Sequence, residues 1–305
     1  MIVDLPDTTI SAVSKALVKV REEGGAVALG RVLTLVISSA GRTDEAAIEA
    51  ANEASREHPM RVIVLSTAPE SATRLDAEIR VGGDAGASDV IVLHAGGDTA
   101  SDPESLVTGL LLPDAPVVVW WPGEAPADPH ESPLGRIGPR RITDAAACSD
   151  PVAALARLGQ NYEPGDTDFA WTRLTLWRAQ LAAVLDQPPY EPVTAVRVVG
   201  SSDSPSTELL AQWLALQLDL DVDLVVKEPG DGPNGIHSVR LDRASGPIEL
   251  SRDGGGVARL TQPDQPAHDI ALPRRSLRDC LAEELRRLDP DELFGDVVRQ
   301  EAATR

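Results

Sequence analysis

The feature that most limits the fold is a series of short, continuous apolar runs separated by helical stretches in the first half of the chain. The runs are Val32 to Ser38, Arg61 to Ser66, Asp89 to Leu93 and Val117 to Trp121. Strands without polar alternation suit a sheet that is covered on both faces. Helices are predicted over 10–20, 43–57 and 101–112. The sequence therefore predicts an α/β domain over residues 1–165, with an open, mostly parallel sheet flanked by helices.

The pattern changes after Pro188. A strand–helix–strand unit is predicted over 195–227, and four short alternating segments follow between 236 and 272. Gly-Pro and Gly-Gly-Gly sequences separate these segments, as in the turns of an antiparallel meander. Two helices close the chain, the first beginning with a capping box at Ser276 and Asp279. Residues 190–305 are therefore expected to form a second, α+β domain.

Residues 166–189, DTDFAWTRLTLWRAQLAAVLDQPP, predict a tryptophan-rich helix that links the two domains. Its apolar positions fall on one face, at spacings of four and three: Ala170, Leu174, Trp177, Leu181 and Val184. Asp166 or Thr167 can cap its start, and Pro188 ends it. One interpretation is a buried core helix between domains. The other is a docking helix for another protein, because Trp and Arg are over-represented at binding hot spots.

Part of that helix, TRLTLWRAQLA, resembles a known protein family, and three other segments resemble the same family. These are MIVDLPDTT…GRVLTLVI at the start, APVVVWWPG in the predicted sheet and EELRRLDPDELF near the end. Together they resemble, in order and over nearly the whole chain, the OpcA family of glucose-6-phosphate dehydrogenase assembly proteins. None of the segments is a catalytic motif. The resemblance implies a non-catalytic partner that binds glucose-6-phosphate dehydrogenase, promotes its active oligomer and regulates the oxidative pentose phosphate pathway.

The resemblance does not indicate which residues contact the partner, so the candidates rest on residue type. The first group is Trp171, Arg173, Trp177 and Arg178. The second group is Trp121, Arg136, Arg140 and Arg141. Adjacent strand residues point to opposite faces, so one of the paired tryptophans at 120 and 121 is expected in the core and the other beneath a helix or at an interface. The three arginines can hold a phosphate or a partner's carboxylate; a solvated loop is the other interpretation.

The formal net charge of −20 limits the partners. Nucleic acids and anionic membrane surfaces bind clustered Lys and Arg, so neither is expected as a partner. The start of the chain does not resemble a secretory signal, and no apolar run is long enough to cross a bilayer. We therefore expect a cytoplasmic protein whose partner presents a basic patch.

Familiar catalytic motifs do not occur in their usual setting: no Gly-x-Gly-x-x-Gly leads into a predicted helix, and there is no Gly-Lys-Ser/Thr and no Gly-x-Ser-x-Gly. The histidines are scattered and the cysteines lack a metal-binding spacing. We expect no enzyme activity, no cofactor and no metal. The alternative function is a sugar-phosphate or nucleotide-binding enzyme or sensor with its site at the carboxy ends of the α/β sheet. His94 and the glycine-rich stretches 82–86 and 96–97 motivate that site.

Two further hypotheses concern an anion and a redox switch. Gly200 to Pro205 joins a strand to a helix start, where backbone N–H groups can hold an anion. Against that, Asp203 would repel a phosphate, and Ser204 is explained as a helix N-cap. Cys148 and Cys280 motivate a redox-responsive regulator. Thiols in a reducing compartment are the default for such a pair, although a disulfide between them is arithmetically allowed.

Overall fold

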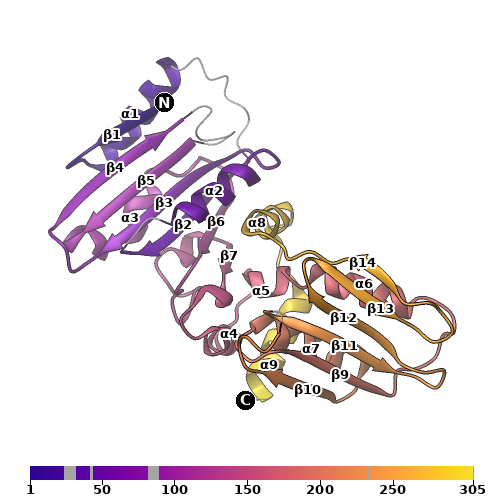
Figure 1. The fold of residues 1–305 in the computed structure, drawn as a ribbon. Coiled ribbons are helices and arrows are strands. Elements are labelled where there is room, and N and C mark those ends of the chain that lie inside the picture. Colours follow the sequence, from indigo (N-terminus) through magenta and orange to yellow (C-terminus); the bar gives the residue numbers. More distant parts are fainter. Residues whose placement is uncertain (24–31, 42–43, 82–88, 233, 305) are drawn as a thin grey trace. The chain divides into compact units, whose positions relative to one another are not determined.

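The computed structural model describes residues 1–23, 32–41, 44–81, 89–232 and 234–304. The chain forms two compact units (Figure 1). Unit 1 consists of Met1–Asp144, Glu163–Thr167 and Ser276–Pro290, and unit 2 of Ala145–Tyr162, Asp168–Arg275 and Asp291–Arg305. Both units are discontinuous in sequence, whereas the sequence predicts contiguous domains over 1–165 and 190–305.

Unit 1 is built on an eight-stranded sheet with the order β1-β4-β5-β3-β2-β6-β7-β8. Its strands are β1 (Ile2–Leu5), β2 (Leu33–Ala40), β3 (Met60–Ala68), β4 (Arg74–Arg80), β5 (Asp89–Gly96), β6 (Val117–Trp121), β7 (Arg140–Thr143) and β8 (Asp166–Asp168). Strands β5, β3, β2, β6 and β7 are parallel, and β4 and β1 add an antiparallel edge. The predicted open, mostly parallel α/β sheet is confirmed.

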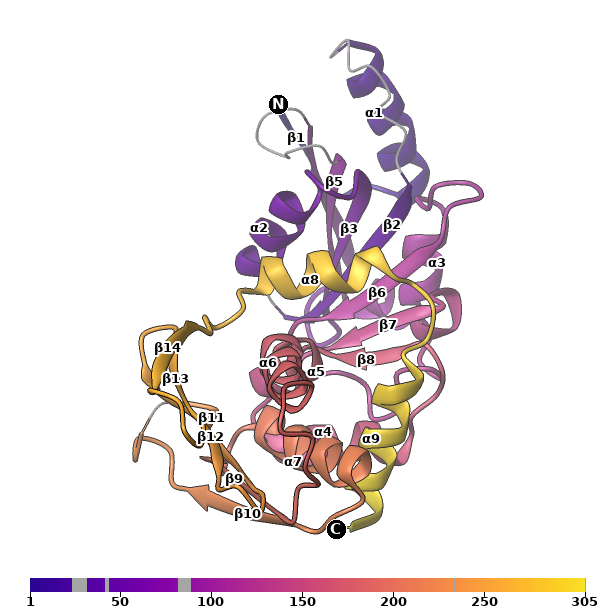
Figure 2. The same cartoon turned by 90° about the vertical axis from the view of Figure 1, so that its right-hand side faces the viewer.

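Helices cover both faces of this sheet, which explains why its central strands are continuously apolar. α1 (Ile10–Glu23) and α3 (Pro103–Thr108) pack on the face that carries Ile63 and Val119. α2 (Glu45–Ala54) and α8 (Leu277–Arg286) contact each other and lie on the opposite face (Figure 2). α8 is held there by a contact of 3.2 Å between His58 Nε2 and the Ala282 carbonyl.

The helix limits in unit 1 follow from capping. Asp44 accepts a hydrogen bond from the Ala47 N–H at the start of α2. The helix expected over 101–112 is shorter, because Asp102 caps α3 and Pro103 is its first residue. A 3-10 helix over Gly97–Ser101 precedes it. Thr43, the first residue of the helix predicted over 43–57, and the glycine-rich stretch 82–86 lie outside the described residues.

Unit 2 has a six-stranded sheet with the order β10-β9-β11-β12-β13-β14. Its strands are β9 (Ala195–Ser201), β10 (Val222–Lys227), β11 (Ile236–Asp242), β12 (Ile248–Gly254), β13 (Val257–Thr261) and β14 (His268–Ala271). β9 and β10 are parallel and are joined by α7 (Pro205–Leu218), while the other neighbours are antiparallel. The predicted βαβ unit and antiparallel meander are confirmed.

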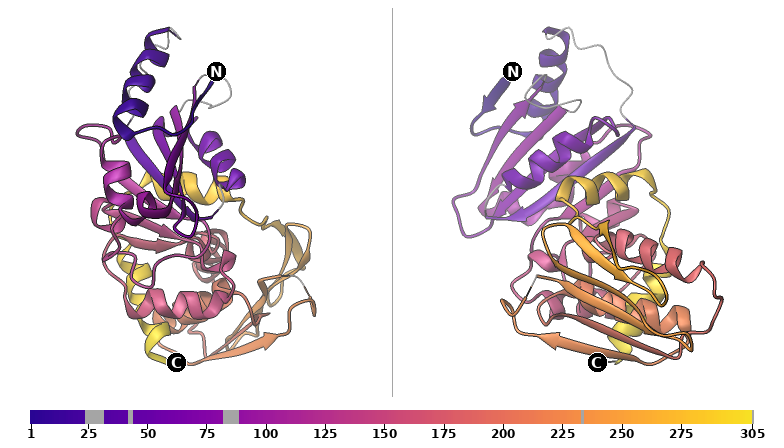
Figure 3. Two further views of the ribbon diagram at one scale, coloured as in Figure 1. Left: turned by 90° about the vertical axis from the view of Figure 1, so that its left-hand side faces the viewer. Right: turned by 45° about the vertical axis from the view of Figure 1, so that its right-hand side comes forward.

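The helices of unit 2 gather on one side of its sheet (Figures 2 and 3). They are α4 (Pro151–Gln160), α5 (Phe169–Thr172), α6 (Thr175–Leu185), α7 and α9 (Glu292–Thr304). α9 packs against both α4 and α7. Their apolar side chains form one buried cluster with those of the sheet, including Phe294 and Val298 of α9.

The single helix expected over 166–189 is divided into three elements. Asp166 to Asp168 form β8, Phe169 to Thr172 form α5, and α6 runs from Thr175 to Leu185. Asp168 causes the late start, because its backbone is extended and its carboxylate accepts hydrogen bonds from the N–H groups of Ala145 and Ala170. The cap is therefore Asp168, and neither Asp166 nor Thr167 caps the helix.

Candidate functional site

Trp171 lies in the core of unit 2, and the residue is 2% exposed. Its Nε1 donates a hydrogen bond of 2.9 Å to Asp291 Oδ2, and its ring centroid lies 5.7 Å from that of Phe294. The guanidinium carbon of Arg178 lies 3.7 Å from the centroid of the Trp171 ring, which is a cation–π distance. The ring therefore joins α5 to the start of α9.

Trp177 is buried in the same core, together with the other members of the predicted apolar stripe, Ala170, Leu174, Leu181 and Val184. The stripe is thus confirmed. Arg252 covers Trp177, with its guanidinium carbon 5.4 Å from the ring centroid. Both tryptophans of these helices serve the packing of unit 2, so a partner would reach this segment through its partly exposed arginines, Arg173 and Arg178.

Trp121 does not reach the surface of unit 1. It is 3% exposed and belongs to the cluster beneath α1 and α3, while Trp120 is fully buried. Both tryptophans at the end of β6 are therefore buried.

Arg140 and Arg141 are buried in ion pairs within unit 1. Arg140 pairs with Glu284 of α8, and Arg141 pairs with Asp166 of β8. Arg141 also donates to the carbonyl oxygens of Gly138 and Pro164, at 3.1 and 2.9 Å. Burial raises the pKa of the Asp166 carboxyl, although Arg141 and the Glu163 N–H both favour its charged form. These arginines hold separate segments of unit 1 together.

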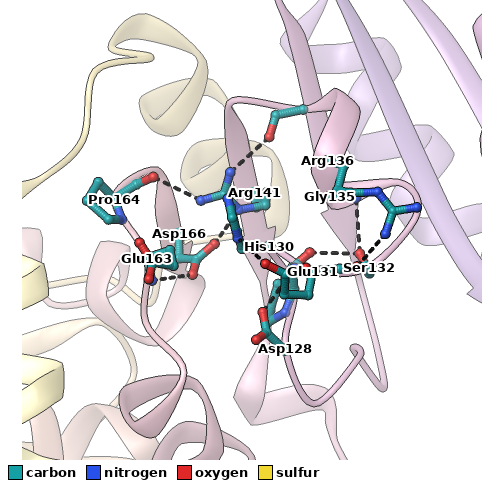
Figure 4. Close-up of polar contacts among 12 residues, drawn as sticks. Asp128, His130, Glu131, Ser132, Gly135, Arg136, Arg141, Glu163, Pro164 and Asp166 are labelled. Carbon is teal, nitrogen blue, oxygen red and sulfur yellow. Dashed lines mark hydrogen bonds and ion pairs between the residues drawn. The ribbon is translucent and has the colours of Figure 1, made fainter.

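Arg136 is the exposed member of the three loop arginines. Its guanidinium donates to the Glu131 carbonyl at 2.8 Å and to the Glu104 carboxylate at 3.3 Å. Figure 4 shows Arg141 pointing toward Asp166 and Pro164, while Arg136 makes a separate set of contacts. The structure therefore does not gather Arg136, Arg140 and Arg141 around one anion.

The loop before β7 keeps its shape through internal contacts. The Ser132 hydroxyl donates to the Pro129 carbonyl and accepts from the Gly135 N–H. A Cβ at Gly135 would lie 1.7 Å from the Pro129 carbonyl oxygen, so only glycine fits there. The loop is therefore a turn fixed by its own hydrogen bonds, and it leaves the Arg136 side chain exposed.

The glycines at the end of β5 are explained by chain packing. A Cβ at Gly96 would lie 2.3 Å from the Ala72 carbonyl oxygen, and one at Gly97 would lie 2.4 Å from Thr73 Oγ1. The turn before β4 therefore occupies the space beside these residues. His94 is exposed, and it pairs in register with Asp76 of β4. The described residues at this end of the sheet supply no support for the alternative ligand site, and the stretch 82–86 lies outside them.

A cavity of about 400 Å³ opens in unit 2 at the start of α7. Four arginines line it: Arg173, Arg252, Arg274 and Arg275. The sequence pointed only to Arg173 among them, and to the neighbouring segment 200–205. No local motif could have found the others, because β12 and the segment before α8 reach the cavity only through the fold.

The described residues offer few groups that suit metal binding or redox chemistry. Within them, no group of three or more His, Cys, Asp or Glu side chains is placed to hold a metal ion. Both cysteines of the chain are described and carry thiols; Cys280 is buried and Cys148 is half-buried. None of the helices formed by the described residues has the length and apolar character that crossing a bilayer requires.

Two family models match adjacent parts of the chain. The glucose-6-phosphate dehydrogenase subunit N-terminal domain matches residues 51–160, and the C-terminal domain of the same subunit matches residues 164–298. Together they cover most of the chain, which defines its class as a dehydrogenase-associated subunit. The chain belongs to the OpcA family of glucose-6-phosphate dehydrogenase assembly proteins.

No curated protein matches the sequence. Among solved structures, glucose-6-phosphate 1-dehydrogenase from Mycobacterium avium is 11% identical with a TM-score of 0.43, over 88% of this chain and 91% of that one. Myo-inositol dehydrogenase from Lactobacillus casei is 11% identical with a TM-score of 0.48, over 89% and 93%. Biliverdin reductase from Synechocystis is 10% identical with a TM-score of 0.45, over 90% and 97%. These scores are too low to support a conclusion about function.

Proposed function

We propose that this protein is a non-catalytic subunit that binds glucose-6-phosphate dehydrogenase and favours its active oligomer. The observation that carries the proposal is the match of both domains of the family, in order, to residues 51–160 and 164–298. The sequence is consistent with this, because it has no Gly-Lys-Ser/Thr, no Gly-x-Ser-x-Gly and no Gly-x-Gly-x-x-Gly that leads into a helix.

Activation would arise from differential binding. If the dehydrogenase has a weakly active and an active form, a subunit that binds the active form more tightly shifts the population toward it. A tenfold shift needs a difference in binding free energy of about 1.4 kcal/mol. A few well-placed anchors can provide that difference.

Of the candidate contact residues, Arg173, Arg178 and Arg136 are the ones whose side chains are partly or fully exposed. The buried candidates, Trp171, Trp177, Trp121, Arg140 and Arg141, would act by holding the docking surface in shape. The proposal therefore places direct contact on Arg173, which follows α5, and on Arg178 of α6, with Arg136 as a second position.

The test is an activity titration of the dehydrogenase from the same organism. Added protein should raise the activity to a plateau, and Arg173→Ala combined with Arg178→Ala should lower the plateau or move it to higher concentration. The matched control is Arg197→Ala with Arg259→Ala, which removes two exposed arginines from the sheet of unit 2. Normal activation by a folded Arg173/Arg178 variant would show that these arginines are not the contact.

A further inference from the structure

The cavity at the start of α7 is strongly cationic although the chain as a whole carries a net charge of −20. Its lining residues include four arginines and one carboxylate, that of Asp203. Its volume of about 400 Å³ is within the range of small-molecule sites. A concentration of one charge sign in a hollow focuses the electric field and attracts ligands of the opposite sign.

Among the lining residues, Arg252 gives the strongest indication that the cavity binds an anion. The residue is 7% exposed, and within the described part of the chain no carboxylate pairs with it. Its Nη1 and Nη2 lie 3.4 Å from the carbonyl oxygens of Leu272 and Ile236, and its Nε has no hydrogen-bond partner among the described atoms. Burial and the nearby Arg274 cation lower the pKa of Arg252. Apart from the Trp177 ring, this buried guanidinium has only long contacts to carbonyl oxygens, and an anion in the cavity would stabilise its charge.

The other cations surround the same hollow from different elements. Arg275 donates to the Thr172 carbonyl at 3.1 Å, and Arg274 donates to the Asn234 carbonyl. Arg173 comes from the segment between α5 and α6. Planar guanidinium groups can bind phosphate through two parallel hydrogen bonds, so several of them around one hollow match a phosphate group.

The start of α7 adds to the positive potential. Ser204, Pro205 and Ser206 line the cavity, and Ser204 is the N-cap of this 14-residue helix. The N-terminus of a helix carries a partial positive charge and is a frequent position for bound anions. Asp203 does not cancel this, because it is exposed at the rim and accepts a hydrogen bond from the Ser201 hydroxyl.

We infer that this cavity binds the phosphate group of a small phosphorylated metabolite, or inorganic phosphate itself, between Arg252, Arg274 and the start of α7. Every residue that forms the site belongs to unit 2, and Arg173 is both in its lining and among the candidate contacts to the dehydrogenase. The site gives this non-catalytic chain a means of responding to a phosphorylated ligand.

The test is titration calorimetry on the full chain with three probes: inorganic phosphate, glucose 6-phosphate and unphosphorylated glucose. Both phosphate-bearing probes should bind, and glucose should not. Tighter binding of glucose 6-phosphate than of inorganic phosphate would assign the site to a phosphate ester, whereas equal affinities would assign it to the phosphate group alone.

Two variants and a control identify the site. Arg274→Gln, an exposed position, should weaken phosphate binding at least tenfold without affecting the fold. Arg252→Met should abolish binding. Arg259→Gln, which removes an exposed arginine of β13 that does not line the cavity, should bind as the original chain does.

Three results would overturn the inference. They are no binding of either phosphate-bearing probe at millimolar concentration, equal binding of glucose, and unchanged binding in both Arg252→Met and Arg274→Gln. If the original chain binds no phosphate but these two variants lose co-elution with the dehydrogenase, the cavity instead receives a carboxylate of the partner protein.

Discussion

Two polar contacts hold Trp171 in place. Asp291, far away in the sequence, accepts a hydrogen bond from its indole N–H, and Arg178 of the neighbouring helix α6 stacks on its ring. An indole that donates to a carboxylate and packs against Phe294 contributes to stability through both burial and hydrogen bonding. The same side chain has little surface with which to contact a partner.

Trp171→Phe should therefore lower the free energy of unfolding by about 1–3 kcal/mol, because it removes the indole hydrogen bond and part of the buried ring. Activation of the dehydrogenase, compared at equal concentrations of folded protein, should not change. Urea unfolding and the activity titration measure the two effects. Unchanged stability together with lost activation would make Trp171 a contact residue instead.

The tryptophan and arginine pattern of 166–189 shows what a sequence can and cannot reveal about single residues. The apolar stripe was predictable, because period 3.6 alone defines it. The burial of Trp171, which lies off that stripe, was not, because Asp291 and Phe294 come from the end of the chain. Residue type alone therefore could not distinguish a core tryptophan from a contact residue.

At the scale of elements, the ion pair of Arg141 and Asp166 fixes the short strand β8 beside β7. Both side chains are nearly inaccessible, at 4% and 1% exposure. The charged pair therefore has to be satisfied internally, and Arg141 also satisfies the carbonyls of Gly138 and Pro164. Removing one partner leaves the other charge buried, which costs far more than the pair itself contributes.

Arg141→Met should lower the free energy of unfolding at pH 7 by about 3–5 kcal/mol. Arg141→Met combined with Asp166→Leu should recover at least half of that loss. In the single variant the folded-state pKa of Asp166 rises further above its unfolded value of 3.8. The folded state then binds more protons than the unfolded state, so this variant should gain stability as the pH falls from 7 toward 4.

Chemical denaturation at several pH values measures this response. A double variant no more stable than Arg141→Met would show that the loss comes from the backbone contacts of Arg141. A single variant whose deficit stays constant from pH 7 to pH 4 would lead to the same conclusion.

The sequence predicted most elements of the two sheets, since strand periodicity and turn residues are local signals. It misplaced the start of the tryptophan helix, because the extended backbone at Asp168 is imposed by its bond to the Ala145 N–H. It also could not place α8 in unit 1, where His58 and Glu57 hold it. The arginines of the cavity escaped prediction for the same reason, since they lie far apart along the chain.

At the scale of the whole molecule, the last 30 residues complete both units. α8 contributes the buried Cys280, Leu281 and Leu285 to unit 1, and α9 contributes the buried Phe294, Val297 and Val298 to unit 2. Full burial of one such apolar side chain is worth about 1.5–3 kcal/mol. Three in one unit approach the entire stability of an ordinary domain.

A chain that ends at Arg275 should therefore fail to fold cooperatively, in unit 1 and unit 2 alike. We expect it to bind a hydrophobic dye and to lose the sharp thermal transition of the full chain. Calorimetry and dye fluorescence, with the full chain as control, test this. A truncated chain that keeps a cooperative transition and excludes dye would show that one of the units folds without its terminal helix.

The central claim concerns the partner, and the most direct measurement combines light scattering on a sizing column with an activity assay. Glucose-6-phosphate dehydrogenase from the same organism would be analysed alone and with this protein. The account predicts that the two proteins elute together, that the mass shifts to one defined assembly, and that activity per dehydrogenase chain rises. Separate elution with unchanged mass and activity, while both proteins are folded, would contradict it.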